Sequence, residues 1–304
     1  MFVPEYLDDL IAAGHTPRAW ALYLRRVWRR SRSNMQRHGD AARSVLTHAV
    51  WLFVLLFAGS VALALAEGAM LGTKLLVAGS SWLIISTLWI LMHLGLLRDA
   101  SGKPFTRFNA ANALTLVRLV LIPSVFVFIV SGERTLAGIT FFASATTDVL
   151  DGFIARRFNQ VSRMGVVLDP LVDMAHNGVT LFALAAAALV PAWVFALVAA
   201  RYGLLLFGSA FIYFKRGRLR IRPTVFGKLT GVLITFMVTA LMLLHVLATG
   251  ESASTLSDLI AIGLGFIFLA TTIQVVVIGW HNFRYAHREE QVVAGPWQNR
   301  ELGG

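Results

Sequence analysis

The sequence predicts an all-α protein whose helices cross a membrane several times. Hydrophobic residues make up 57% of its 304 residues and charged residues only 14%, and the mean hydropathy is +0.70. A water-soluble domain could not cover so much apolar surface. The first apolar run begins near Ala49 and contains no small-residue cleavage site, so it is interpreted as a retained span rather than a removed signal peptide.

About eight segments have the roughly 20 mostly apolar residues that a helix needs to cross the hydrocarbon core. They are Val50–Ala66, Lys74–Leu97, Ala111–Val130, Leu136–Ile154, Val167–Val190, Ala192–Phe214, Leu229–Ala248 and Leu259–Trp280. Gly132, Pro191 and the stretch 249–258 are expected to separate neighbouring spans. The predicted architecture is therefore a polytopic transmembrane helix bundle.

Basic residues gather on alternate loops between these segments. The clusters are Arg18–Arg43, Arg98–Arg107, Arg156–Arg163, Lys215–Arg222 and the stretch from Arg284 onward. The other loops carry only Lys74 and Arg134. Short loops rich in Lys and Arg stay in the cytoplasm, so both termini are expected to be cytoplasmic, in a multi-pass protein of a bacterial inner membrane.

The formal charge of +11 also bears on partners. In a soluble protein it would suggest nucleic acid, but the sequence contains no nucleic-acid-binding motif, and a bilayer offers anionic headgroups instead. The segment Pro17–Arg37 mixes aromatic and aliphatic residues with seven arginines. It is interpreted as a helix lying on an anionic membrane surface, with a solvated tail that only sets topology as the alternative.

Four aspartates inside or beside the predicted spans stand out, because a carboxylate at membrane depth is costly and usually functional. Asp148 and Asp151 are three residues apart, and Asp169 and Asp173 are four apart, so each pair shares one face of a helix. Two such faces on neighbouring antiparallel helices can converge. With no cysteine in the chain, oxygen ligands of this kind favour Mg²⁺ or Mn²⁺, and two ions could clamp a pyrophosphate.

The same stretch contains eight positions of a longer pattern. It runs Asp148, Asp151, Gly152, Ala155, Arg156, Gly165, Asp169 and Asp173, with the spacing D-x2-D-G-x2-A-R-x8-G-x3-D-x3-D. This resembles, at every fixed position, the signature of the CDP-alcohol phosphotransferases. The likeness extends to the sequence Asn112-Ala-Leu-Thr115-Leu-Val-Arg118 and to Gly227-Lys228, and it covers six of the predicted spans.

The resemblance implies a role for each matching residue. Asp148, Asp151 and Asp169 would hold the metal ions, and Asp173 would share the metal site and act as general base toward the acceptor hydroxyl. Asp148, Gly152, Ala155, Arg156 and Gly165 would contact the CDP-lipid. The reaction implied is transfer of a phosphatidyl group from CDP-diacylglycerol to a small alcohol with release of CMP.

Several further residues are candidates for phosphate or acceptor contacts. They are Asn112, Thr115, Arg118, Arg216, Arg218 and Lys228. For Arg118, which lies inside an apolar span, the alternative is an ion pair with one of the aspartates. The sequence assigns no role to Arg201 or to His176, although His176 follows Asp173 by three residues and could support the metal site.

The identity of the acceptor alcohol is the most detailed inference from the sequence. The runs Arg156-Arg157-Phe158-Asn159-Gln160 and Leu168-Asp169-Pro170-Leu171 resemble the phosphatidylglycerophosphate synthase branch, which predicts glycerol 3-phosphate. That branch usually has a lysine after the last aspartate, where this chain has Met174. Inositol phosphate, serine or choline are therefore kept as alternative acceptors. From other classes, the alternatives are a cation or proton transporter and a catalytically silent scaffold.

The predicted organisation follows from these assignments. Residues 1–46 form a basic segment, 47–98 two additional spans, 110–282 the six-helix catalytic domain, and 283–304 a cytoplasmic tail. The expected partners are the CDP-diacylglycerol donor, the alcohol and anionic membrane lipids, and a homodimer is compatible with the resemblance.

Overall fold

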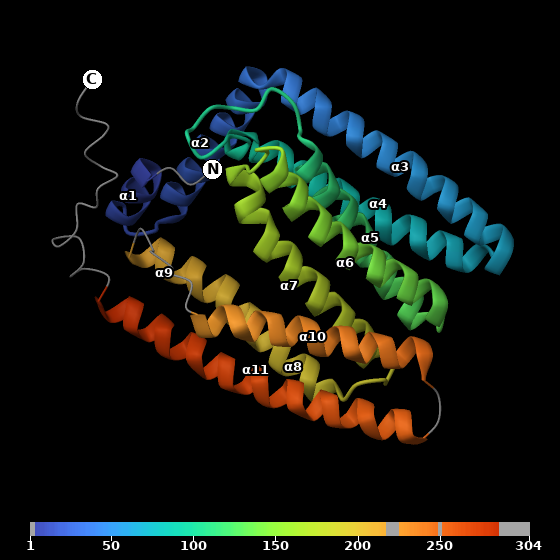
Figure 1. Ribbon diagram of the computed structural model, residues 1–304. Coiled ribbons are helices and arrows are strands. Elements are labelled where there is room, and N and C mark those ends of the chain that lie inside the picture. The colour runs from blue at the N-terminus through green and yellow to red at the C-terminus, as the bar shows by residue number, and fades with distance from the viewer. Residues whose placement is uncertain (1–3, 217–224, 249–250, 286–304) are drawn as a thin grey trace.

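The protein folds into a bundle of long helices (Figure 1). The computed structural model describes residues 4–216, 225–248 and 251–285, and the side chains of 6–215, 231–248 and 255–280. Of the described residues, 87% are helical and none lies in a strand. A single β-bridge joins Arg98 to Pro104 in the segment between two helices. The all-α prediction is confirmed.

The described residues form the following helices in chain order. They are α1 (Pro4–Ala12), α2 (Pro17–Arg37), α3 (Gly39–Glu67), α4 (Ala69–Met92), η1 (Leu94–Leu96), α5 (Ala110–Val130), α6 (Arg134–Arg157), α7 (Arg163–Ala186), α8 (Ala192–Gly203), η2 (Leu204–Gly208), α9 (Ser209–Arg216), α10 (Val225–Leu247) and α11 (Glu251–Tyr285). Each of the eight predicted spans overlaps one of these helices or, for α8 to α9, one continuous helical run.

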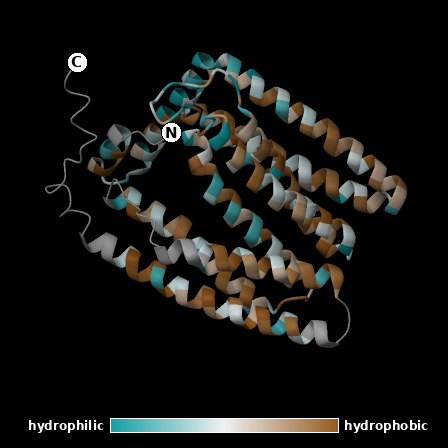
Figure 2. Cartoon of the chain, viewed as in Figure 1, coloured by the Kyte–Doolittle hydropathy of each residue, from teal (hydrophilic) through white to brown (hydrophobic). Residues whose placement is uncertain are grey.

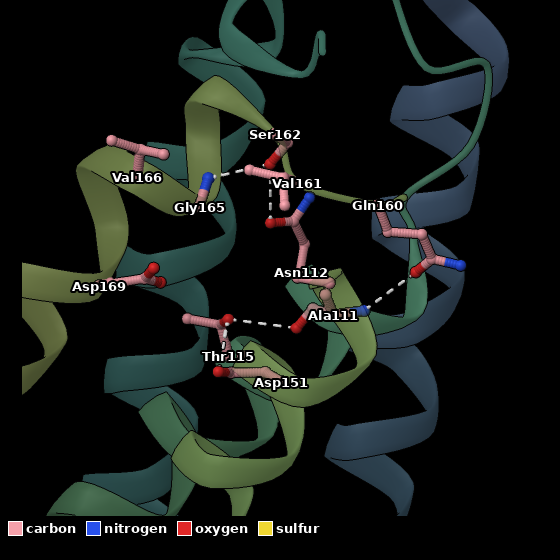
Figure 3. A pocket seen from close by; sticks show the side chains of 12 residues that line it. Ala111, Asn112, Thr115, Asp151, Gln160, Val161, Ser162, Gly165, Val166 and Asp169 are labelled. Atoms are coloured by element: carbon pink, nitrogen blue, oxygen red, sulfur yellow. Dashed lines mark hydrogen bonds between the residues drawn. The ribbon is translucent and has the colours of Figure 1, made fainter. Parts of the chain in front are cut away.

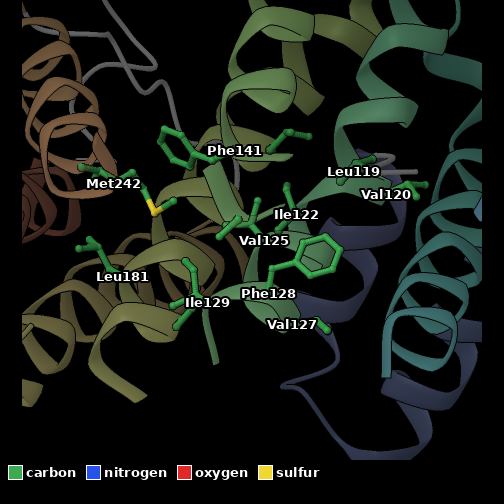
Figure 4. Close-up of a cluster of buried hydrophobic side chains, with 14 of the residues drawn as sticks. Leu119, Val120, Ile122, Val125, Val127, Phe128, Ile129, Phe141, Leu181 and Met242 are labelled. Carbon is green, nitrogen blue, oxygen red and sulfur yellow. The ribbon is translucent and has the colours of Figure 1, made fainter. Parts of the chain in front are cut away.

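Helix α5 is the centre of the bundle. It packs against α4, α6 and α7, and its apolar residues are buried around most of its circumference, as expected of a helix with neighbours on several sides. Figure 4 shows Leu119, Ile122, Val125 and Phe128 of α5 in the hydrophobic core, which also contains Phe141 of α6. This packing holds α6 and α7, which carry the four aspartates, on either side of α5.

The additional helices α3 and α4 form a hairpin that joins the bundle through α4. Close approach of the two helices depends on Gly72, where a Cβ atom would lie 2.4 Å from the carbonyl oxygen of Ser60. The outer helix α3 leaves large apolar side chains such as Trp51 and Leu65 exposed. In Figure 2, hydrophobic residues run along most of the length of the long helices, as expected where lipid covers them.

Five helical stretches are long and apolar enough to cross a membrane. They are Gly39–Glu67, Ala69–Met92, Ala110–Val130, Ala192–Lys215 and Thr255–Trp280. Helices α6 and α7 are long enough but carry the aspartates and arginines of the motif, and the apolar part of α10, Gly231–Leu247, is shorter. A multi-pass membrane protein is confirmed, whereas eight crossings remain a prediction that includes the polar pair α6 and α7.

Three predictions about the spans differ in detail from the structure. Helix α11 begins at Glu251, so most of the stretch 249–258 that was expected to separate spans is helical. Helix α4 ends at Met92, and the residues up to Leu97 include a short 3-10 turn. The predicted span Ala192–Phe214 is interrupted by a π-helical turn at Leu204–Gly208. Because π-turns insert one residue into a helix, they shift the face that follows, and hydropathy alone does not reveal such a shift.

The insertion topology can be tested with single cysteines, because the chain has none of its own. A cysteine replacing Ser131, in the turn between α5 and α6, is expected to react with an impermeant maleimide in intact cells. One replacing the exposed Ser101, at the opposite end of α5 in the basic connector, should react only after permeabilisation. Labelling of position 101 in intact cells would contradict the predicted orientation.

Candidate active site

The four aspartates lie on an antiparallel helix pair. Asp148 and Asp151 are in the last turns of α6, and Asp169 and Asp173 are in the first turns of α7. The chain reverses between the helices at Asn159, which has a positive φ of 52°. The backbone N–H of Gln160 donates to the carbonyl of Ala155 at 2.8 Å and closes the end of α6. The turn thus brings the two carboxylate pairs to one end of the bundle, as the spacing predicts.

Asp151 is the buried member of the group, with 7% of its surface exposed. Its Oδ2 lies 3.0 Å from Oγ1 of Thr115, one of the candidate contacts predicted on α5. The hydroxyl satisfies a carboxylate oxygen that burial would otherwise leave without a donor. Thr115 therefore holds Asp151 in a defined orientation.

Arg118 is the buried cation of the site, with 4% of its surface exposed. It donates through Nη1 to Asp148 and through Nη2 to Oδ1 of Asp173, the latter at 2.5 Å. One guanidinium from α5 thus joins a carboxylate of α6 to one of α7, which offsets the cost of burying the charge. The structure shows the ion-pair alternative for this residue, and a phosphate contact stays a prediction.

Asp169 has a different environment from the other three. Its side chain is exposed, and it is close enough to Asp148, Asp151 and Asp173 to be repelled by all of them. No hydrogen-bond donor reaches it from the described side chains. Four carboxylates thus share one guanidinium, and a cation would relieve the remaining repulsion.

The carboxylates are not arranged as a finished metal centre. Among the described side chains, no group of three or more acidic, histidine or cysteine residues is positioned to hold one ion. Arg118 pairs with one oxygen of Asp148 and one of Asp173. The donor set nevertheless suits a hard divalent cation, since it offers carboxylate and hydroxyl oxygens and the chain has no thiolate.

A pocket of about 50 Å³ opens beside Asp151 (Figure 3). Its lining comes from the start of α5, the end of α6 and the start of α7, and consists of Ala111, Asn112, Thr115, Asp151, Gly152, Ala155, Gln160, Val161, Ser162, Gly165, Val166 and Asp169. Six other predicted site residues line this pocket together with Asp151. Gly152, Ala155 and Gly165 leave the walls low because their side chains are small or absent.

Two N-caps position the polar groups of this pocket. The side chain of Asn109 accepts from the backbone N–H of Asn112 at 2.9 Å at the start of α5, and Ser162 accepts from that of Gly165 at 2.9 Å at the start of α7. Ser162 also donates to Oδ1 of Asn112 at 3.1 Å. The Nδ2 group of Asn112 is buried and has no partner. A ligand with an acceptor atom would satisfy it.

Sequence reasoning missed three groups that build this pocket. Ser162 and Gln160 lie in the turn between α6 and α7, and Gln160 accepts from the backbone N–H of Ala111 through Oε1 at 3.4 Å. Asn109 donates through Nδ2 to the carbonyl of Gln160 at 2.9 Å. The N-cap pattern of Ser162 and Asn109 was visible in the sequence, because both are favoured cap residues directly before a helix.

Some predicted contacts lie apart from the pocket. Arg156 is exposed, and its guanidinium extends over Gly152, where a Cβ atom would lie 3.3 Å from Nη1. The predicted contacts Arg216, Arg218 and Lys228 lie outside the residues whose side chains the structure describes. His176 is buried. Its Nδ1 lies 3.1 Å from Oγ of Ser144, and its ring packs against that of Phe141.

Arg201 occupies a separate aromatic environment on α8. Its guanidinium carbon lies 5.6 Å from the ring centre of Tyr202 and 5.7 Å from that of Phe268. These cation–π contacts partly replace the hydration that the charge loses. The arginine for which the sequence suggested no role is thus held by packing between α8 and α11.

Comparison with known proteins adds independent information. A family model described as CDP-alcohol phosphatidyltransferase matches residues 108–278, which is more than half of the chain. The chain is also similar to three proteins named CDP-diacylglycerol–glycerol-3-phosphate 3-phosphatidyltransferase. The one from Aquifex aeolicus is 30% identical over 140 residues, covering 45% of this chain and 78% of that protein.

The other two matches cover fewer residues at a higher sequence identity. The protein from Blochmanniella floridana is 44% identical over 74 residues, which are 23% of this chain and 39% of its own length. The protein from Escherichia coli strain K12 is 44% identical over 70 residues, which are 22% of this chain and 38% of its own length. The chain thus spans less than half the length of these two relatives. The matched family model includes both aspartate pairs and the helices that carry them, and the chain belongs to the CDP-alcohol phosphatidyltransferase family.

Proposed function

We propose that this protein transfers a phosphatidyl group from CDP-diacylglycerol to glycerol 3-phosphate and releases CMP. The observation that carries the proposal is the convergence of the full eight-residue signature at the turn between α6 and α7, beside the pocket at Asp151. The name shared by the three relatives supports glycerol 3-phosphate as the acceptor. The predicted inositol phosphate, serine and choline are the alternatives that the experiment must separate.

The donor is assigned to the α6 side of the site. Gly152, Ala155 and Gly165 leave the backbone open, and the unpartnered Nδ2 of Asn112 can donate to the nucleotide. A pocket of about 50 Å³ admits only part of a CDP group, so the remainder would extend along the exposed ends of α6 and α7. The exposed Arg156 is placed to pair with a phosphate there.

Members of this family are generally metal-dependent. Asp148, Asp151, Asp169 and Asp173 are the residues that would hold Mg²⁺ or Mn²⁺, and we propose two ions. When bound, such ions neutralise charge on the pyrophosphate and on the leaving phosphate. Thr115 fixes the carboxylate of Asp151, and Arg118 pairs with Asp148 and Asp173 and so holds these two carboxylates close together.

The transfer is a single displacement at phosphorus. The acceptor hydroxyl oxygen forms a bond to the phosphatidyl phosphorus while the bond from that phosphorus to the CMP oxygen breaks, and the hydroxyl proton passes to Asp173. CMP leaves with the bonding electron pair. Asp173 suits the role of base because its side chain is exposed on α7, across the site from the pocket that we assign to the nucleotide.

The organisation proposed for the chain follows from the same assignment. Helices α5 to α11 form the catalytic unit, and α1 to α4 lie outside the residues matched by the family model. A cation transporter would instead need paired interrupted helices in two similar halves. The π-turn at Leu204–Gly208 is the one interruption of that kind within the described ranges, so the transporter gains no support.

The proposal is tested by incubating the purified full-length protein with CDP-diacylglycerol and one alcohol at a time while measuring CMP. Glycerol 3-phosphate is expected to give the fastest release and a lipid product with two phosphates, and reactions without an acceptor serve as the control. A doubly charged acceptor profits from charge-assisted contacts worth roughly 1.5 to 3 kcal/mol each. A clear preference for serine, choline or inositol phosphate would overturn the acceptor and leave the family chemistry intact.

A further inference from the structure

A second recess lies outside the catalytic unit, between α2 and the end of α4. It encloses about 180 Å³ and is lined by Trp28, Ser31, Arg32, Met35, Leu88, Leu91 and Met92. It shares no lining residue with the pocket beside Asp151. The hydroxyl of Ser31 is already engaged, since it donates to the carbonyl of Met92 at 2.8 Å. The groove therefore has apolar walls and one guanidinium, that of Arg32.

The sequence of α2 creates this groove through its helical periodicity. Tyr23, Val27 and Ser31 recur every four residues and form the stripe that is buried against the protein. Trp28 and Arg32 follow one position later on the helix and form the adjoining stripe, which faces the groove. The buried stripe holds α2 in place, so the groove is a property of packing rather than of a loosely attached helix.

The groove lies at one end of a candidate membrane span, where lipid headgroups are expected to meet hydrocarbon. Its α4 wall is formed by the last turns of a candidate membrane span, Ala69–Met92. Trp28 is 58% exposed and Leu88 is 55% exposed, and tryptophan is enriched at this level of a bilayer. Lipid molecules therefore have direct access to the groove.

Charge defines the occupant further. Arg25, Arg29 and Arg32 are exposed on α2, and none of them pairs with a carboxylate among the described side chains. Arg26 is the arginine of this helix that does so, at 2.5 Å from Asp9. An apolar groove that is lined by one unpaired guanidinium group is complementary to a molecule with an acyl chain and an anionic phosphate.

We propose that the groove between α2 and α4 binds an anionic phospholipid of the bilayer. A section of one acyl chain lies against Leu88, Leu91 and Met35, and the phosphate pairs with Arg32. A cavity of about 150 Å³ is large enough to hold benzene, so about 180 Å³ accepts part of a chain but not a whole lipid. The site binds a lipid that is not consumed, and it is independent of the four aspartates.

Native mass spectrometry of the full-length protein tests this site. The protein is mixed with phosphatidylglycerol or phosphatidylcholine of identical chains, and the lipids retained per protein are counted. Arg32→Gln is expected to lower phosphatidylglycerol retention about tenfold or more, as expected from the loss of one charge-assisted phosphate contact. Phosphatidylcholine should lose less, because its trimethylammonium group already offsets the charge of its phosphate. Arg18→Gln removes the same charge from an exposed position on α2 that does not line the groove, so it should behave as wild type.

A second variant tests the apolar wall without changing charge. Leu91→Trp fills part of the groove and is expected to lower phosphatidylglycerol retention, while soluble glycerol phosphate in excess should not compete because it has no chain. If Arg18→Gln and Arg32→Gln lowered phosphatidylglycerol retention equally, the lipid would be held by general surface charge, and the proposed site would be overturned. Competition by glycerol phosphate, or full retention in both groove variants with wild-type elution in gel filtration, would overturn it as well.

Discussion

Replacing Asp151 by Asn is expected to lower the rate of CMP release by roughly 10² to 10³, the usual loss when one transition-state stabilising group is removed. Asp151 is the buried carboxylate of the group, held by Thr115 at 3.0 Å. Asn has nearly the same shape and can still accept from that hydroxyl, so the fold should survive. The lost charge weakens the binding of the ions that we propose for this site, and CDP-lipid affinity should fall with the rate.

The measurement is CMP release by the purified variant over a range of Mg²⁺ and Mn²⁺ concentrations. Asp258→Asn is the matched control, because it makes the same change at an exposed residue of α11, outside the pocket, and it should keep the wild-type rate. Excess chelator should bring the wild type down to the level of Asp151→Asn, with recovery on adding either ion. Full activity of the wild type in chelator would show that the carboxylates do not act through a metal.

The second large effect is expected at Asp173, where replacement by Asn should lower turnover by roughly 10² to 10⁴ through loss of the general base. Donor affinity should change far less, because Asp173 does not line the pocket assigned to the nucleotide.

Steady-state kinetics with both substrates separates this role from metal binding. The Asp173→Glu variant keeps the charge that pairs with Arg118 and displaces the carboxylate, so it should turn over faster than the Asn variant and more slowly than the wild type. If the Asn variant instead lost donor affinity as severely as Asp151→Asn, Asp173 would be a metal ligand only. A near wild-type rate would remove it from the mechanism.

The local features of this protein could be derived from the sequence because they depend on short-range periodicity. Apolar runs of membrane length predicted the helices, and the spacing of three and four residues placed each aspartate pair on one helix face. The cap residues Asn109 and Ser162 stand directly before their helices. The family followed from eight residues within one window, and the comparisons confirm it.

Tertiary structure alone decided which groups meet across helices. Arg118 lies 30 and 55 residues from its two carboxylate partners, and hydropathy could only indicate that it faces the interior. The contact of Thr115 with Asp151 and the groove between α2 and α4 depend in the same way on side chains that are distant in the sequence. Periodicity states which face of a helix is turned inward, whereas the partner on that face is set by how the helices pack, and packing is a property of the whole bundle.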